Sequence, residues 1–214
     1  MRFLHLSIFG SLVPPSRESC LCNKSHRLPF GESTLKSSSP FELVYSDEWG
    51  PSPVTSLDGY KYYMIFVDHF TEYIWLYPLR FKSDVFDTFV QFKNNVENYF
   101  KTIVSVYTDG GGEFIKLKDF FLKCGISHLY TPPYTLQHNG IVERRHRHIV
   151  ETGITLLHQA SLPPKFWSFA FQTAVYLINR LPSRTTGMQC PFQLLFKETS
   201  NYNKLKIFGC LCYP

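Results

Sequence analysis

The sequence predicts one α/β domain in which a mixed sheet of about five strands carries helices on both faces. Two patterns indicate this class: short apolar runs bounded by turn residues follow residue 40, and they then alternate with stripes of helical period. The composition agrees, because 20 Phe and 13 Tyr favour a core that contains a sheet over a helical bundle. With 214 residues, of which 44% are hydrophobic, the chain is long enough to bury such a core.

The first three strands are predicted to form an antiparallel meander. Apolar and polar residues alternate over 41–46, which predicts a strand that ends at Ser46 and Asp47. Two nearly continuous apolar and aromatic runs, at 60–68 and 73–79, predict buried strands. Only a few residues separate these two runs, so a hairpin joins them.

Helices and strands alternate in the next part of the chain. An amphipathic stripe predicts a helix that Ser83 caps and that continues to residue 99. A fourth strand over 103–108 ends on Asp109. A second helical stripe over 114–124 stops at Gly125, a residue typical of the position after a helix.

The last part of the chain is mainly helical. A fifth short strand is predicted over 126–131, and a long helix over 141–159 follows it. Prolines separate this helix from another over 165–180. The sequence after it is weakly periodic, and residues 206–214, KIFGCLCYP, predict a strand.

These patterns divide the chain into three regions. Residues 1–40 are rich in Ser and Pro and predict a poorly ordered arm, 41–182 form the core, and 183–214 form a C-terminal extension. No small-residue cleavage pattern follows the apolar N-terminus and no later segment reaches the length of a membrane span, so neither secretion nor membrane insertion is expected. The six cysteines are irregularly spaced and are expected to be reduced.

Three carboxylates fall at the ends of predicted elements. Asp47 follows the first strand, Asp109 follows the fourth, and Glu143 lies in the first turn of the long helix. If the first and fourth strands are neighbours, the two aspartates project from the same edge of the sheet. Such a cluster suits Mg²⁺, which prefers oxygen ligands, and two such ions about 4 Å apart support phosphoryl transfer.

The residues alone leave other interpretations open. A single Asp at a strand end is usually a turn residue or a helix cap, and Glu143 can simply favour the helix dipole. Asp58 and Asp68 are equally acidic, and spacing does not exclude them. The net charge of +5 is only mildly basic and does not by itself establish a nucleic-acid partner.

The sequence motifs around these acids resemble those of a known family, the integrase catalytic core of copia-type LTR retrotransposons, which are common in plants. The resemblance runs from about residue 41 to residue 214 and marks the chain as a truncated fragment of such a protein. The motifs that carry it are KSHRLPF, YSDEWGP, TDGGGEF, PYTLQHNGIVERRHR, RLPSRTTGMQCPFQLL and FGCLCYP.

This resemblance implies a ribonuclease-H-like fold and a D,D,E triad of Asp47, Asp109 and Glu143. The triad would hold two Mg²⁺ or Mn²⁺ ions for 3′-end processing of the element's DNA and strand transfer into target DNA. Asp68 aligns as a strand residue and not as a ligand. The resemblance also implies a homo-oligomer located in the nucleus or in a cytoplasmic virus-like particle.

Candidate DNA contacts lie on both sides of Glu143. Gln137 and Asn139 are in what resembles the flexible catalytic loop before the long helix. The helix then carries a basic cluster that is expected to form one face and to neutralise phosphates, and a solvated surface helix is the alternative. The cluster consists of Arg144, Arg145, His146, Arg147 and His148.

The sequence departs from the family at several points. Gly110 stands where Asn is usual, Leu136 stands where Pro is usual, and the interval from Asp109 to Glu143 is shorter than usual. The family's N-terminal zinc module needs two His and two Cys, but Arg17 replaces one Cys beside Cys20 and no His pair precedes it at the family spacing. No zinc site is therefore predicted.

Three functions remain open at this point. The first is an integrase core whose triad persists. The second is a catalytically inactive relic that at most binds nucleic acid or another subunit, which the departures favour. The third is a hydrolytic nuclease of the RNase H type, which shares the triad and differs in its nucleophile. Whether the chain is an enzyme is left undecided by the residues alone.

Overall fold

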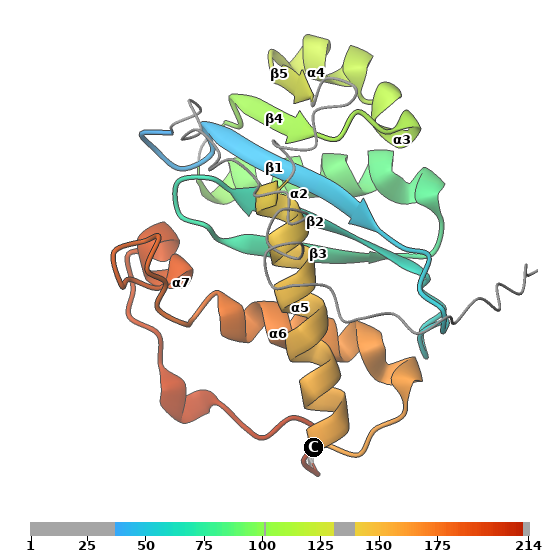
Figure 1. Cartoon of the computed structure of the whole chain (residues 1–214). Helices are drawn as coiled ribbons and strands as arrows, with labels where there is room; N and C mark the ends of the chain where they lie inside the picture. Colours follow the sequence, from blue (N-terminus) through green and yellow to red (C-terminus); the bar gives the residue numbers. More distant parts are fainter. Residues whose placement is uncertain (1–36, 101, 131–139, 212–214) are drawn as a thin grey trace, which may run out of the picture. The chain divides into compact units, whose positions relative to one another are not determined.

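The computed structural model describes residues 37–100, 102–130 and 140–211, and the predicted sheet of five strands is confirmed. Its order is β3-β2-β1-β4-β5 (Figure 1). The first three strands form the expected antiparallel meander, and β4 and β5 run parallel to β1. The strands are β1 (Leu43–Trp49), β2 (Tyr62–Asp68), β3 (Ile74–Leu79), β4 (Ser105–Thr108) and β5 (Ser127–Tyr130).

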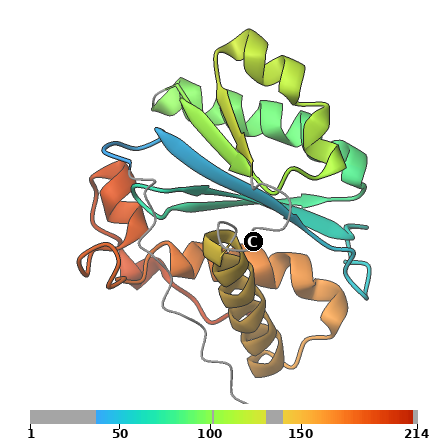
Figure 2. The same cartoon turned by 45° about the horizontal axis from the view of Figure 1, so that its top comes forward.

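Three helices cover one face of the sheet (Figure 2). They are α2 (Val85–Tyr99), α3 (Gly112–Ile115) and α4 (Lys118–Cys124). Phe92 of α2 stacks on Phe66 of β2 with ring centroids 3.8 Å apart, and Phe89 meets Phe121 of α4 edge to face at 4.8 Å. Large aromatic side chains thus fill this layer of the core.

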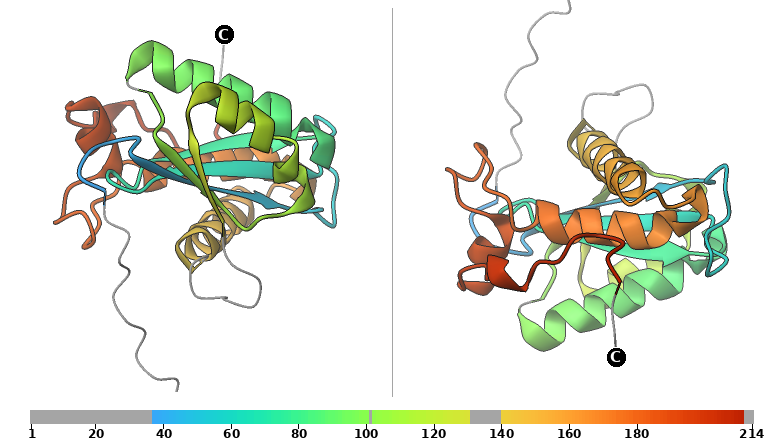
Figure 3. Two further views of the ribbon diagram at one scale, coloured as in Figure 1. Left: turned by 90° about the horizontal axis from the view of Figure 1, so that it is seen from above. Right: turned by 90° about the horizontal axis from the view of Figure 1, so that it is seen from below.

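Two helices cover the opposite face (Figure 3). They are α5 (Gly140–Gln159) and α6 (Trp167–Ile178), with a short 3₁₀ turn η2 (Pro164–Phe166) before α6. A Cβ on Gly153 of α5 would collide with the ring of Phe171 on α6. Glycine at this position therefore lets the two helices approach closely.

Several predicted boundaries shift. The first strand continues to Trp49, so the prediction that it ends at Asp47 is wrong. Asp47 lies inside β1, because β2 pairs with β1 as far as Trp49. Ser83 does not cap α2, since it lies in the 3₁₀ turn η1 (Lys82–Asp84) and Asp84 occupies the N-cap. Gly125 does follow α4, with a left-handed φ of 69°.

The region after α6 differs most from expectation. Helix α7 (Pro191–Phe196) was missed, and its Phe196 packs edge to face on Tyr73 and Phe100. The short 3₁₀ turn η3 (Tyr202–Lys204) follows. The strand predicted from residue 206 is absent over the described residues 206–211, because the chain turns at Gly209, whose φ is +80°. A Cβ added at Gly209 would lie only 2.6 Å from Cβ of Ala160.

None of the helices in the described ranges is both long and apolar enough to cross a membrane. Among the described residues, Cys124 and Cys190 carry free thiols. Residues 1–36, which hold most of the predicted N-terminal arm and the sequence region of the zinc module, lie outside the described residues.

Candidate active site

The two aspartates of the predicted triad lie side by side. Strands β1 and β4 are parallel neighbours, and Tyr45 is paired with Tyr107. Asp47 and Asp109 each follow two residues later, so they occupy equivalent places at the carboxyl end of this strand pair. The condition set by the sequence, that the first and fourth strands are adjacent, is therefore met.

The carboxyl group of Asp109 lies where the chain leaves β4. Gly111 donates its backbone N–H to Oδ1 at 2.9 Å, and Gly110 turns the chain with a φ of +78°. Partial burial raises the pKa of Asp109, the Gly111 hydrogen bond lowers it, and the negative charges of Asp47 and Glu113 raise it further. Asp109 thus belongs to a locally acidic edge that favours a cation.

Asp47 is tied to α5 through a buried histidine. Nε2 of His146 lies 3.3 Å from Oδ2 of Asp47, and Nδ1 lies 3.0 Å from the hydroxyl of Tyr63. Burial and the charge of Asp47 raise the pKa of Tyr63, so its hydroxyl keeps its proton and can donate it to Nδ1. The other ring nitrogen, Nε2, lies against the carboxylate of Asp47 without forming a well-aligned hydrogen bond.

The third acid is near but is not joined to the other two. Glu143 lies in the first turn of α5, one helical turn before His146, and its side chain is exposed. Within the described residues, no group of three His, Cys, Asp or Glu side chains is arranged to hold a metal ion. The structure therefore brings Asp47 and Asp109 together and leaves Glu143 on the adjoining helix face.

The basic residues after Glu143 do not share one face, so that expectation is wrong. Arg144 and Arg147 are exposed, Arg145 forms an ion pair with Glu72 at 2.7 Å, and His146 is buried with 8% of its surface exposed. Consecutive residues of a helix point in different directions, which explains the division. The other candidate DNA contacts, Gln137 and Asn139, lie outside the described residues.

A second acidic pair, which sequence reasoning missed, lies on the other face of β1. The side chain of Glu48 is only 2% exposed, and Lys82 Nζ approaches its Oε1 at 3.4 Å and Oε1 of Glu113 at 3.8 Å. Burial raises the pKa of Glu48, and the charge of Lys82 lowers it. Successive residues of a strand face opposite sides, so Asp47 and Glu48 serve different layers. The lysine partner offsets the charge of this pair.

The other acids that spacing could not exclude have different surroundings. Asp68 is fully buried at the end of β2, where its carboxylate accepts hydrogen bonds from Phe41 N at 2.7 Å and from Thr71 N and Oγ1 at 2.8 and 2.6 Å. Asp58 is an exposed turn residue. Asp68 is therefore a structural strand-end residue, consistent with the alignment that the resemblance implied.

The fold defines the class of this domain: it is a ribonuclease-H-like domain, the fold that integrase catalytic cores also have. It is similar to a chain of the simian T-cell lymphotropic virus intasome in complex with PP2A regulatory subunit B56 gamma, with a TM-score of 0.63, 18% identity, and coverage of 80% of this chain and 60% of that one. It is also similar to the HTLV-2 integrase catalytic core domain in complex with magnesium (trimeric form), with a TM-score of 0.55, 17% identity, and coverage of 74% and 99%.

Sequence relatives narrow the comparison: the chain is similar to a segment of the retrovirus-related Pol polyproteins of plant transposons. It is 57% identical over 200 residues to the retrovirus-related Pol polyprotein from transposon RE2 of Arabidopsis thaliana, covering 93% of this chain and 14% of that protein. It is 37% identical over 207 residues to the corresponding polyprotein from transposon TNT 1-94 of Nicotiana tabacum, covering 95% and 16%. The chain thus spans only a small part of these relatives. No protein-family model matches it.

Proposed function

We propose that this chain is the catalytic core of metal-dependent polynucleotidyl transfer, performing 3′-end processing and strand transfer in DNA integration. The observation that carries the proposal is the parallel register of β1 and β4, which sets Asp47 beside Asp109. His146, one helical turn after Glu143 on α5, contacts the carboxylate of Asp47.

The residues present fit a hard divalent cation. Asp47 and Asp109 offer carboxylate oxygens at one edge, and the charge of each is unfavourable to the other. Glu143 would complete the ligand set from α5. Two bound Mg²⁺ or Mn²⁺ ions supply an activated nucleophile and a stabilised leaving oxygen. Magnesium is present in the HTLV-2 core to which the fold is similar.

The surrounding residues have separate roles in this proposal. Gly110 and Gly111 let a phosphate approach Asp109 closely. Arg144 and Arg147 are exposed beside Glu143 and neutralise phosphates without reading sequence. Arg145 was also a candidate DNA contact, but its guanidinium is bound to Glu72 and instead fixes α5. Gln137 and Asn139 remain proposed contacts of the loop before α5.

The partners that follow are the element's DNA ends, target DNA and further copies of this chain. One similar structure is an intasome chain and another is a trimeric form of a catalytic core. A nuclear location or a virus-like particle is consistent with such partners.

The inactive relic is the second candidate, because Glu143 does not join the aspartates in a three-residue group. A strand-cleavage and strand-transfer assay with Mn²⁺ and a labelled duplex separates the two. We expect cleavage by the parent chain, and loss to background in Asp47→Asn, Asp109→Asn and Glu143→Gln with the fold retained. Asp58→Asn, which changes an exposed turn residue outside β1 and β4, is the matched control and should keep activity.

The outcomes of this assay also address the third candidate. Joined products indicate an integrase, whereas nicked strands alone indicate a hydrolytic nuclease. Residual cleavage in any of the three triad variants contradicts the assignment of that residue. A parent chain that binds DNA but leaves it intact supports the relic.

A further inference from the structure

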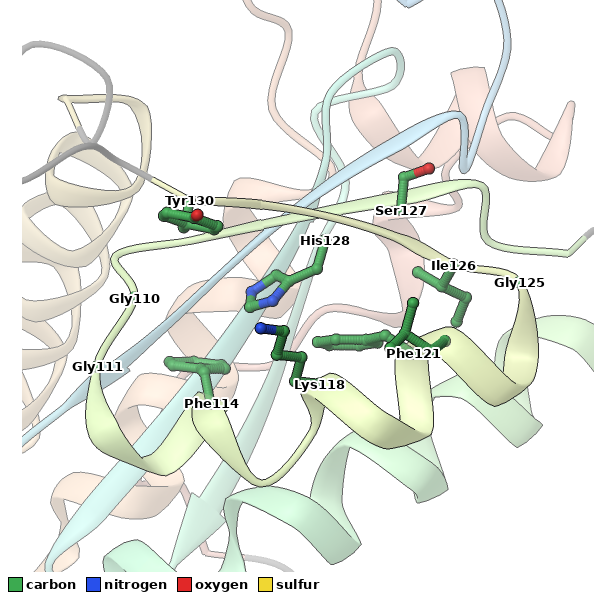
Figure 4. A pocket seen from close by; sticks show the side chains of 11 residues that line it. Gly110, Gly111, Phe114, Lys118, Phe121, Gly125, Ile126, Ser127, His128 and Tyr130 are labelled. Atoms are coloured by element: carbon green, nitrogen blue, oxygen red, sulfur yellow. The ribbon is translucent and has the colours of Figure 1, made fainter.

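A cavity of about 670 Å³ lies beside the candidate active site and has no role in the function proposed above (Figure 4). It opens between β5, which is an edge strand of the sheet, and helices α3 and α4. Ligand pockets of proteins commonly have volumes of about 300–1,000 Å³, so a group of nucleoside size fits. The residues that matter for its chemistry are Gly110, Phe114, Lys118, Phe121, His128 and Tyr130.

The cavity is lined by flat rings that the fold holds in place. The rings of Phe121 and His128 have centroids 4.8 Å apart, and those of His128 and Tyr130 are 5.9 Å apart. Thr108 Oγ1 lies 3.0 Å from Nε2 of His128 and fixes the imidazole. Burial and the charge of Lys118 lower the pKa of His128, so this ring is neutral at pH 7 and behaves as an aromatic surface.

The cavity is also continuous with the acidic edge. In the parallel pair of β4 and β5, Tyr130 lies opposite Thr108, the residue before Asp109. Gly110 and Gly111 leave Asp109 and form part of the cavity wall. A Cβ on Gly110 would lie 3.7 Å from Cβ of Tyr130, so the mouth of the cavity is one strand spacing, about 4.8 Å, from the strand that carries Asp109.

We propose that this cavity binds an unstacked nucleobase of the DNA strand whose phosphate lies at Asp47 and Asp109. The inference rests on the proposed function. Aromatic faces stack on any base, and enzymes that act on DNA ends or single strands use such platforms. The ammonium of Lys118, at the wall, suits the adjoining phosphate or a base carbonyl. A protein strand added to β5 is the competing occupant, but it would not account for a ring-lined cavity whose wall includes Gly110 and Gly111, the two residues that follow Asp109.

The test compares two DNA duplexes that differ only in an unpaired terminal nucleotide, which carries adenine in one and is abasic in the other. Binding to the full 214-residue chain is measured by fluorescence anisotropy in Ca²⁺ buffer. We expect the adenine overhang to bind at least about five-fold more tightly, since stacking of one base contributes about 1–3 kcal/mol.

Variants of Tyr130 locate the effect in this cavity. Its side chain is 61% exposed, so Tyr130→Ala is expected to fold and to bind both duplexes alike. Tyr130→Phe keeps the ring and should keep the preference. Tyr99→Ala, at the end of α2 and 82% exposed, is the matched control and should also keep it.

Each contrary result has a defined meaning. Equal affinity of the parent for both duplexes, with strand cleavage intact, overturns the base pocket and leaves the proposed function standing. A preference that survives in Tyr130→Ala, or that is lost in Tyr99→Ala as well, overturns it too. If Tyr130→Ala keeps the preference but weakens self-association, the cavity belongs to a protein segment. Absence of DNA binding by the parent overturns both proposals.

Discussion

Asp68 and Asp109 lie at opposite ends of the strands of the same sheet. Asp68 ends β2, which is antiparallel to β1, whereas Asp109 follows β4, which is parallel to β1. In both, burial raises the pKa of the carboxyl above its usual value of 3.8. Asp68 is fully buried and accepts hydrogen bonds from Phe41 and Thr71 on both of its oxygens. Asp109 lies at the surface with its carboxyl only partly screened from water, and it accepts a backbone hydrogen bond from Gly111.

The neighbours of the two acids explain their different roles. Hydrogen bonds from Thr71 and Phe41 favour the charged form of Asp68 and partly offset the effect of its burial on the pKa. The charges of Asp47 and Glu113 add to the cost of ionising Asp109. A shifted pKa alone therefore does not mark a functional acid: the kind of neighbour, donor or carboxylate, separates a structural residue from a candidate metal ligand.

The largest effect on stability is expected at Asp68, the fully buried acid. Asp68→Ala leaves the buried N–H groups of Phe41 and Thr71 without acceptors, so we expect a loss of about 3 kcal/mol in the free energy of unfolding. Urea unfolding without metal measures it. Asp109→Ala is the counterpart and should change stability by less than about 1 kcal/mol. Similar losses in both variants would remove the distinction.

The second expectation concerns metal binding at Asp47 and Asp109. Mn²⁺ at about 100 times its Kd should stabilise the parent by about 2.7 kcal/mol, because a ligand that binds only the folded state raises its stability. Thermal unfolding of the parent and of Asp109→Asn makes the measurement, and Asp119→Asn, an exposed acid on α4, is the control. If parent and Asp109→Asn respond alike, the aspartates do not form a metal site and the relic is favoured.

A smaller effect is expected in the pH dependence of stability without metal. Because the pKa of Asp109 is raised in the folded state, the folded chain holds this proton more tightly than the unfolded chain, and stability falls as pH rises from about 4 through the folded pKa. Asparagine does not titrate, so Asp109→Asn should gain relative to the parent across that window, by less than about 1 kcal/mol because solvent screens the charge. A constant difference between the two chains, from urea unfolding at a series of pH values, would contradict the raised pKa.

The smallest expected effect on stability distinguishes the ion-paired Arg145 of α5 from the exposed Arg147. Arg145→Ala removes the ion pair with Glu72 and should cost about 0.5 kcal/mol of stability, because the pair is partly exposed. Arg147→Ala should leave stability unchanged, weaken DNA binding across sequences and reduce its salt slope by about one. Thermal unfolding and salt titrations of DNA affinity test both. An unchanged salt slope in Arg147→Ala would make this residue part of a solvated surface.

Local sequence patterns were sufficient to predict most strands and helices but not to predict where each one ends. Periodicity predicted all five strands and the helices α2, α5 and α6. It missed α7, whose six residues are too short for a helical stripe, and it predicted a strand near Gly209 that a backbone turn prevents. It also placed Asp47 after β1, since pairing with β2 to Trp49 is a long-range interaction.

The sequence by itself determined that this is an α/β domain of five strands, and that Asp47 and Asp109 lie near strand ends, because periodicity and turn residues are local properties. Only the tertiary structure decided that β1 and β4 are neighbours, that His146 joins Asp47 to Tyr63, and that Arg145 is engaged by Glu72. Strand order and side-chain partners depend on contacts between residues far apart in the chain, which no local pattern specifies.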